Sequence, residues 1–317
     1  MQRAFGLGRN PHLSLRRLAR LLALLCAFFL VAYGVSERGA LALAFDSSLA
    51  DDEPSQDSDV AVSEEGEFDS LSRALAAERR IEGSELQFRV DNVSRFIRNE
   101  RVATYSSSTV FYDDMVFDFV GENGEIVVYS FRLQKFTLID PIRRIRTEID
   151  ETEIDRFLAR IKIILRDKED GFSTFMTEPS FDISQKEDEF FFQSKWIDYR
   201  ATTAPFEGEA QADAYFRFVD AMGKLNVYMN PGVVTPLARM EANRKFMQDS
   251  RFPKKVVAEI YPKGKTIFTK TFQVENESSL SRRLSERDRS RINRAIHFFV
   301  QFPFVSFKTY FEKTNGR

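Results

Sequence analysis

The amino-acid sequence predicts an α+β fold in which several helices pack against an antiparallel β-sheet meander. Three observations lead to it. Strand-like segments separated only by turns fill residues 86–149, a second such series fills residues 180–203, and helical patterns follow each series. No segment recurs at a fixed period, which argues against solenoids and propellers.

The first 44 residues have the layout of an export signal. Five arginines precede an uncharged apolar run, Leu21–Val35, and Ala42 and Ala44 supply the small side chains of a cleavage site. At about 1.5 Å per residue the run spans roughly 22 Å, which is short of the ~30 Å of a bilayer core. We therefore expect a signal peptide at 1–44, with an uncleaved membrane anchor through residues 21–35 as the alternative. Both interpretations export the rest of the chain, to the periplasm or the extracellular space.

Residues 45–68 are expected to form a disordered acidic linker. Ten acidic residues and no lysine or arginine lie between positions 46 and 70, and few large apolar side chains accompany them. Residues 69–317 are then expected to form a single α+β domain. It opens with a short amphipathic helix from Asp69 to about Glu82, before Gly83.

The first meander is expected within residues 86–149. Its turns are indicated by Asp113-Asp114, by the Asn-Gly of 121–124 and by Asp140-Pro141. The strands between them are predicted at Val102–Tyr112, Met115–Val120, Ile126–Phe131, Phe136–Ile139 and Ile142–Ile149.

A helix is predicted over Glu151–Arg166, with Asp150 and Glu153 spaced as a capping box, and a loop over 167–174. The second meander follows, and then two helices that form a possible helical insertion at 209–249. A hairpin and a last helix come after them, the helix starting behind Ser285 with Asp288 in capping-box position. The strands are expected at Ser180–Ser184, Asp188–Ser194, Trp196–Thr203, Val256–Tyr261 and Thr266–Val274, and the two helices at Glu209–Tyr228 and Pro236–Asp249.

The composition removes several classes of function. After residue 44 there is no cysteine and one histidine, His297, so disulfides, thiolate or histidine-clustered metal sites and cysteine nucleophiles are excluded. No Gly-x-Ser-x-Gly elbow or phosphate-binding glycine motif occurs. We therefore predict no catalytic residue, no metal and no cofactor. The net charge is −2 and no concentrated basic face is evident, which argues against a nucleic-acid partner.

Two groups of acidic residues are open to a functional interpretation. The acids from Glu148 to Asp155 precede a helix, where the helix dipole favours negative charge without a metal. Asp113 and Asp114 suit a turn, and Asp118 is expected on the solvent side of its strand. A carboxylate-based hydrolase using these three aspartates stays open as a lesser alternative.

Two groups of residues are candidates for binding. Arg143, Arg144 and Arg146 form a basic patch that fits an anionic partner, or that protects an exposed strand. The chain also contains 32 phenylalanines, and an aromatic sheet can enclose an apolar ligand or simply fill a core. The candidate ligand-binding residues are Phe117, Phe119, Phe190, Phe192 and Trp196.

The order of elements over residues 69–275, most closely over Val102–Ile149, resembles the Lol-type lipoprotein-carrier family of the bacterial envelope. The resemblance implies that the meander curves into a half-barrel with helices against its concave side. No residue motif of that family can be carried over to this sequence. The chain also resembles exported bacterial proteins that have no assigned activity.

We expect an exported, non-catalytic envelope protein that binds an apolar or amphipathic partner, such as a lipid or a lipidated peptide, on its aromatic-rich sheet. The alternative is a structural or interaction module with a filled core, which contacts another envelope protein through exposed sheet edges.

Overall fold

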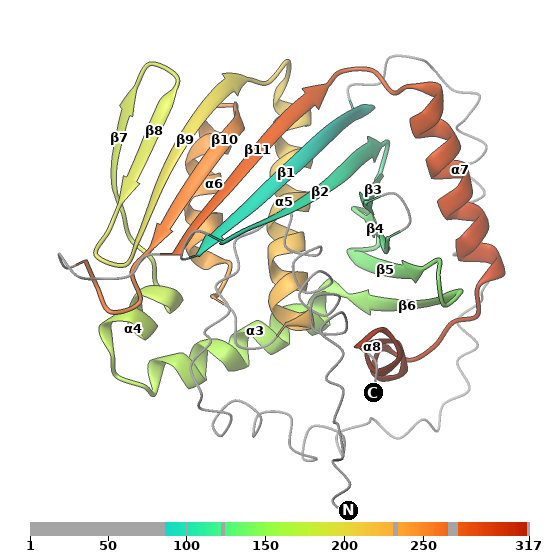
Figure 1. Ribbon diagram of the computed structural model, residues 1–317, viewed down its shortest axis with the longest axis horizontal. Helices are drawn as coiled ribbons and strands as arrows, with labels where there is room; N and C mark the ends of the chain where they lie inside the picture. The colour runs from blue at the N-terminus through green and yellow to red at the C-terminus, as the bar shows by residue number, and fades with distance from the viewer. Residues whose placement is uncertain (1–85, 99–100, 122–123, 231–233, 266–271, 316–317) are drawn as a thin grey trace, which may run out of the picture.

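The computed structural model describes residues 86–98, 101–121, 124–230, 234–265 and 272–315 (Figure 1). The predicted signal peptide, the acidic linker and the helix at 69–82 lie outside these residues. Within the described part, no helix combines the length and the apolar character that crossing a membrane requires.

The described residues form one open antiparallel sheet of eleven strands and six helices, which confirms the predicted α+β class. The strands are β1 Phe88–Arg98, β2 Arg101–Tyr112, β3 Met115–Val120, β4 Ile126–Ser130, β5 Lys135–Asp140, β6 Ile145–Asp150, β7 Asp182–Lys186, β8 Glu189–Gln193, β9 Ile197–Pro205, β10 Arg251–Ile260 and β11 Phe272–Ser281. The helices are α3 Glu151–Arg166, α4 Gly171–Thr177, α5 Glu209–Met229, α6 Leu237–Gln248, α7 Glu286–Gln301 and α8 Phe307–Asn315.

The sheet consists of two meanders that meet in its middle. Its strand order is β6-β5-β4-β3-β2-β1-β11-β10-β9-β8-β7, so the first meander runs outward from β1 and the second runs inward to β11. Strands β1 and β11 pair antiparallel from Arg89 opposite Ser281 to Ile97 opposite Gln273. Chain segments that are far apart in sequence therefore form the centre of the sheet.

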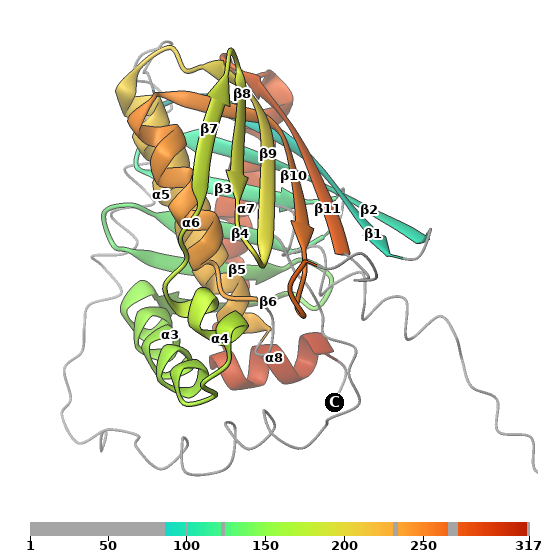
Figure 2. The same ribbon diagram turned by 90° about the vertical axis from the view of Figure 1, so that its left-hand side faces the viewer.

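The two faces of the sheet are covered by different helices. Strands β9, β10, β11, β1 and β2 run diagonally in Figure 1, whereas β5 and β6 run nearly horizontally, so the sheet bends strongly. Helices α5 and α6 lie against its inner face (Figures 1 and 2). The larger hydrophobic core lies on that face. Helix α5 contributes several of its side chains, among them Tyr215, Phe216, Phe218 and Leu225. Helix α7 covers the opposite, outer face of β2–β5, where a second core contains Phe117, Phe119 and Ile296.

The element boundaries depart from the sequence-based expectation in several places. Residues 142–144 form a turn rather than part of a strand, because the Asp140 carboxylate accepts hydrogen bonds from the backbone N–H groups of Ile142 and Arg143, 2.9 Å each. Helix α3 has the predicted bounds, but the Asp150 side chain makes no cap. The sequence did not predict α4, which lies partly within the expected loop, or α8.

Candidate functional site

Helix α7 lies across the outer face of β3–β5 and is fixed at both ends. At its start Ser285 and Asp288 form the predicted capping box, and Asp288 also accepts a hydrogen bond from Arg89 of β1 at 2.9 Å. After its end, residues 303–305 pair with the edge strand β6: the N–H of Arg146 donates to the Pro303 carbonyl at 3.1 Å, and the N–H of Val305 donates to the Arg146 carbonyl at 2.9 Å. The middle of α7 packs on the sheet through apolar contacts that include Ile292, Ala295 and Ile296.

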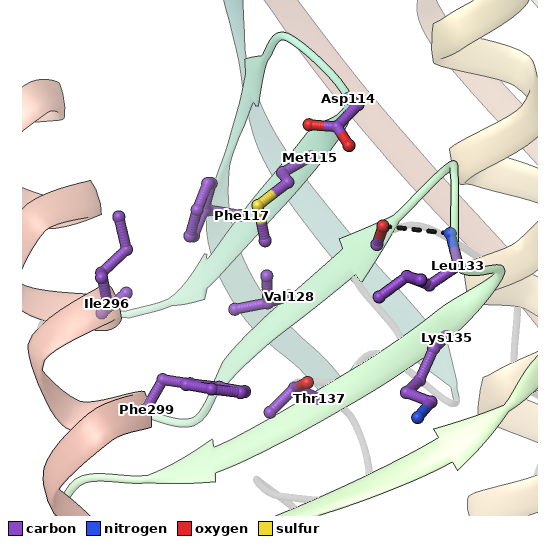
Figure 3. Close-up of a pocket in the computed structure, with 11 residues that line it drawn as sticks. Asp114, Met115, Phe117, Val128, Leu133, Lys135, Thr137, Ile296 and Phe299 are labelled. Atoms are coloured by element: carbon purple, nitrogen blue, oxygen red, sulfur yellow. Dashed lines mark hydrogen bonds between the residues drawn. The ribbon is translucent and has the colours of Figure 1, made fainter. Parts of the chain in front are cut away.

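Two small pockets lie between α7 and the sheet, at neighbouring positions along the same strands. The first has a volume of about 30 Å³ and an apolar floor, with Asp114 and Lys135 at its rim (Figure 3). The second has a volume of about 70 Å³. The first pocket is lined by Asp114, Met115, Phe117, Val128, Ser130, Leu133, Lys135, Thr137, Ala295, Ile296 and Phe299, and the second by Phe119, Val120, Gly121, Gly124, Ile126, Pro141, Arg291, Arg294 and Phe298.

The Phe117 and Phe119 rings separate the two pockets. They point to the same face from alternate positions of β3, with centroids 6.4 Å apart. Figure 3 shows Phe117 and Val128 of the sheet directed toward Ile296 and Phe299 of α7. The two pockets and the rings between them, here called the α7 site, form an aromatic-floored groove.

Two arginines of α7 border the second pocket. The Arg291 guanidinium lies 4.0 Å from the centre of the Phe119 ring, and Arg294 is exposed beside it. Burial lowers the pKa of Arg291, and the positive charges of Arg287 and Arg294 act in the same direction, whereas the carboxylates of Asp288 and Asp118 act against them. An anion at this position would relieve the repulsion among the arginines, so the α7 site suits a molecule with an apolar chain and an anionic group.

The structure distributes the five predicted aromatic residues over three environments. Phe117 and Phe119 lie in the α7 site. Phe190 and Phe192 of β8 are fully buried on the inner face, each 5.3 Å from the ring of Phe246 in α6. Trp196 is half-buried and packs edge-on against Phe172 of α4 at 5.7 Å.

The predicted basic patch surrounds the β5–β6 turn and makes contacts within the protein. Arg143 forms an ion pair with Asp140 at 2.7 Å, and Arg146 pairs with Glu148. The Arg146 guanidinium also lies 4.2 Å from the Phe299 ring centre, and that of Arg144 lies 5.7 Å from the Phe302 ring centre. The patch is therefore continuous with the C-terminal end of α7.

The three aspartates of the hydrolase alternative occupy different environments. Asp113 lies in the β2–β3 turn with φ 54°. Asp114 lies 3.7 Å from Arg132, and the two half-exposed side chains form a surface ion pair. Asp118 was expected to face solvent, but it is only 4% exposed because helices cover both faces of β3. Burial raises the pKa of Asp118, although hydrogen bonds from Thr109 and Ser107 oppose this effect.

Asp118 ends a row of buried hydrogen bonds, here called the polar row, that crosses four strands. Thr109 donates to Asp118 at 2.7 Å, Asn92 donates to Thr109 at 3.4 Å, and Ser278 donates to Asn92 at 2.7 Å. Asn276 and Ser94 continue the row on β11 and β1, at 2.9 and 2.7 Å. Each buried side chain of the polar row thus has a hydrogen-bond partner, as buried polar groups require.

The inner face contains a second polar cluster. Arg239 of α6 is 6% exposed and lies 6.0 Å from the ring centre of Tyr199. The Asp220 carboxylate accepts a hydrogen bond from Asn243 at 2.6 Å, and burial raises its pKa to about 6. The adjoining pocket of about 10 Å³ is too small for a ligand without movement of α6.

The acids before α3 connect that helix to the rest of the domain. Glu151 accepts hydrogen bonds from Tyr129 at 2.6 Å and Lys224 at 2.9 Å. Lys224 also lies 2.9 Å from Asp155, and although burial acts to lower the pKa of Lys224, the two carboxylates raise it. No group of three or more metal-ligating His, Cys, Asp or Glu side chains is found in the described ranges.

The sequence contained a signal for the α7 site that was not recognised. Arg287, Arg291 and Arg294 recur at spacings of four and three residues, the pattern of one helix face. The apolar positions and the cap predict the helix, and these arginines mark a second, basic face beside its apolar one. Because Phe298 shares that flank, the arginines lie beside an aromatic ring rather than in a purely polar surface.

The fold and the site define a class: an α+β protein built on one open antiparallel sheet, with an arginine-bordered aromatic groove under an outer helix. Comparison with known proteins adds a weak structural likeness. No protein-family model and no curated protein matches the sequence.

Among the solved structures that match, two illustrate the low degree of similarity. A structure of PNGF-II is 6% identical with a TM-score of 0.26, and the match covers 72% of this chain and 32% of that one. The chain thus spans about a third of the length of PNGF-II. A LolA superfamily protein from Nitrosomonas europaea is 9% identical with a TM-score of 0.24, covering 68% of this chain and 95% of that one. The chain therefore has a weak resemblance to a LolA superfamily structure, and similarity of this degree carries no argument about function.

Proposed function

We propose that this chain is an exported, non-catalytic envelope protein that binds an amphipathic anionic partner, a lipid or a lipidated peptide, in the α7 site. The observation that carries the proposal is the second pocket, where the apolar side chains Phe119, Ile126 and Phe298 adjoin Arg291 and Arg294. Phenylalanine rings hold an acyl chain through apolar contact, and guanidinium groups bind a carboxylate or a phosphate.

Occupation of the groove requires the α7 site to widen. Pockets for drug-sized ligands measure roughly 300–1,000 Å³, which is more than the second pocket offers. The C-terminal flank of the helix is suited to such a movement, because Phe298 and Phe299 are only partly buried. The ends of α7 stay attached through the capping box and through β6, so the ligand displaces side chains rather than the helix.

Two measurements test this function on the full chain. Native mass spectrometry after mild extraction should reveal a bound lipid, and a fluorescent fatty acid should bind to the purified protein. The double variant Arg291→Gln/Arg294→Gln removes both cations at the pocket. Because a hydrogen bond to a charged group contributes about 1.5–3 kcal/mol, we expect the affinity for the fatty acid to fall about tenfold or more.

The matched control is Arg156→Gln/Arg160→Gln, which removes two exposed arginines from α3 and changes the net charge equally. It should leave fatty-acid binding unchanged. Equal binding by both double variants would place the fatty acid elsewhere on the chain, for example on the apolar run Leu21–Val35. A mass without bound lipid, together with no binding of the fluorescent probe, would count against the proposal.

A second candidate function is an interaction module with a filled core. It is supported by the burial of Phe117, Phe190 and Phe192, and by edge strand β7, whose five residues are all exposed. An exposed edge can pair with a strand of another protein. Ile183 is 44% exposed on β7, so Ile183→Glu should abolish co-purification of an envelope partner if this candidate is correct. Unchanged co-purification, or no reproducible partner, would contradict it.

A further inference from the structure

The basic flank of α7 extends beyond the pocket. Arg287 lies one turn before Arg291 on the same flank, and Arg294 follows it. At the C-terminal end of the helix the Phe298 and Phe302 rings stack at 4.7 Å, and Arg144 lies over the Phe302 ring. The arginines of α7 and Arg144 of the β5–β6 turn therefore belong to one surface.

Among the described residues, no carboxylate lies within ion-pair distance, 4.0 Å, of Arg144, Arg287, Arg291 or Arg294, although Asp288 and Asp118 attract Arg291 from farther away. The nearest acids are already engaged. Asp288 pairs with Arg89, Asp140 pairs with Arg143, and Asp118 is buried in the polar row. Glu286 precedes Arg287 by one residue, so it points about 100° away around the helix. Among the described residues, this surface thus has several positive charges that no ion pair offsets, and Glu286 is an exposed acid at the start of the helix.

An exposed aliphatic side chain lies within this surface. Ile142 is 69% exposed, the largest exposed fraction among the large hydrophobic side chains of the described residues. It follows Pro141, which lines the second pocket, and precedes Arg143 and Arg144 in the β5–β6 turn. Arginines around an exposed apolar side chain are the composition of a surface that binds at a membrane interface.

We propose that the arginine strip, consisting of Arg144, Arg287, Arg291 and Arg294 with Ile142 at its edge, docks on the surface of an anionic phospholipid bilayer. The arginines contact lipid phosphates and Ile142 enters the region of the headgroups. An anionic bilayer offers both phosphates for the arginines and an apolar environment for Ile142, so it fits both observations. This inference goes beyond the proposed function: ligand binding uses the pocket, while docking also uses Arg144, Arg287 and Ile142, none of which lines it.

The test is flotation of the full chain with vesicles. Phosphatidylcholine vesicles are compared with vesicles that also contain phosphatidylglycerol, and the ratio of the two bound fractions is measured. The apolar contribution of Leu21–Val35 cancels in this ratio, and the anionic preference of the five arginines before it is the same in every variant, so it cancels when variants are compared. Each arginine near an anionic surface changes partitioning about fivefold, so Arg144→Gln/Arg287→Gln should lower the ratio about twenty-fivefold. Ile142→Ser should lower binding to the anionic vesicles about fivefold, and added salt should weaken it.

The controls are matched on α3. Arg156→Gln/Arg160→Gln removes the same charge from another exposed helix, and Ile163→Ser removes a side chain that is 60% exposed. Loss of the ratio in the strip variants with retention in the α3 variants supports the proposal. Equal binding to both kinds of vesicle, or an equal loss in the α3 variants, overturns it.

Two further outcomes are informative. If binding to phosphatidylglycerol appears only after the ten acids of residues 46–69 are changed to amides, the proposal is overturned and the strip is assigned to that segment of the chain. Arg144→Gln/Arg287→Gln should still bind the fluorescent fatty acid. Failure of docking and failure of ligand binding are therefore distinguished by separate variants and separate readouts.

Discussion

At the scale of single residues, Thr109 occupies the key position of the polar row. Its hydroxyl donates to Asp118 and accepts from Asn92, and both neighbours are buried. Thr109→Val keeps the shape of the side chain but removes one hydrogen bond from each of two buried groups, the Asp118 carboxylate and the Asn92 amide. Because an unsatisfied buried polar group costs about 1–3 kcal/mol, we expect Thr109→Val to lower the free energy of unfolding by about 2 kcal/mol or more.

Urea unfolding measures this change. Thr104→Val is the matched control, since Thr104 lies on the same strand and is exposed, and it should change stability by less than about 0.5 kcal/mol. Equal effects of the two substitutions would show that the polar row does not stabilise the centre of the sheet.

Asp220 predicts a pH dependence of stability. Burial raises the pKa of Asp220 from 3.8 to about 6, although Asn243 and Arg239 oppose this effect. Between these values the folded protein retains a proton that the unfolded chain has lost, so stability falls as the pH rises through this window. The loss is complete above about pH 6 and amounts to about 3 kcal/mol.

Asp220→Asn removes this titration. The variant should match the unchanged protein near pH 3.8 and exceed its stability above about pH 6. Urea unfolding at several pH values gives the difference between the two proteins, in which other titrating groups cancel. A constant difference across the window would contradict the assignment to Asp220.

At the scale of elements, the start of α7 depends on its capping box. Ser285 accepts a hydrogen bond from the N–H of Asp288, whose carboxylate in turn accepts from the N–H of Ser285 at 2.8 Å. Loss of an N-cap costs about 1 kcal/mol. We therefore expect Ser285→Ala to reduce the free energy of unfolding by about 1 kcal/mol and to increase hydrogen exchange in the first turn of α7.

Ser290 provides the control, because it is exposed in the interior of the same helix. Alanine has a higher helix propensity than serine, so Ser290→Ala should leave stability unchanged or raise it by a few tenths of a kcal/mol. A comparable loss in both variants would indicate a general sensitivity of α7 rather than capping.

The same elements show what local sequence patterns can predict. The bounds of β3 and α3 follow from turn residues and apolar spacing, and both were predicted correctly. Helix α7 was located by Ser285 and Asp288. Helices α4 and α8 have seven and nine residues, too few for a clear period, and are fixed by tertiary contacts such as the full burial of Tyr310.

The candidate site was predicted only in part. The aromatic content identified Phe117 and Phe119, which line the α7 site. The sequence grouped them with Phe190 and Phe192 because alternation shows which residues share a strand face, but it does not show which helix covers that face. The arginines of α7 come from a segment more than 160 residues away, so only the folded chain brings them together with Phe119.

At the scale of the whole molecule, two meanders form a single sheet because β1 pairs with β11. The sequence predicted strands for β2–β6, a second meander at 180–203 and a later hairpin, but not β1 or the junction, since this pairing joins residues as much as 192 positions apart, Arg89 and Ser281. The polar row and the contact between Arg89 and Asp288 also cross this junction. Opening it would therefore expose the hydrogen bonds of both halves together.

This arrangement predicts the order of hydrogen exchange and one cooperative unfolding transition. The paired residues Ser94 and Asn276 lie at the centre of the sheet with strands on both sides, and their strands can separate only if the two halves come apart, so their amides should exchange among the slowest. Edge strand β7 should exchange fastest among the strands.

Trp196, the single tryptophan of the chain, lies between β8 and β9 and reports on the second half. Its fluorescence and the far-UV circular dichroism of the whole protein should follow the same urea transition. Two halves that fold independently would instead give separate transitions, with faster exchange at β1 and β11 than within either meander, because the junction would open before the halves unfold.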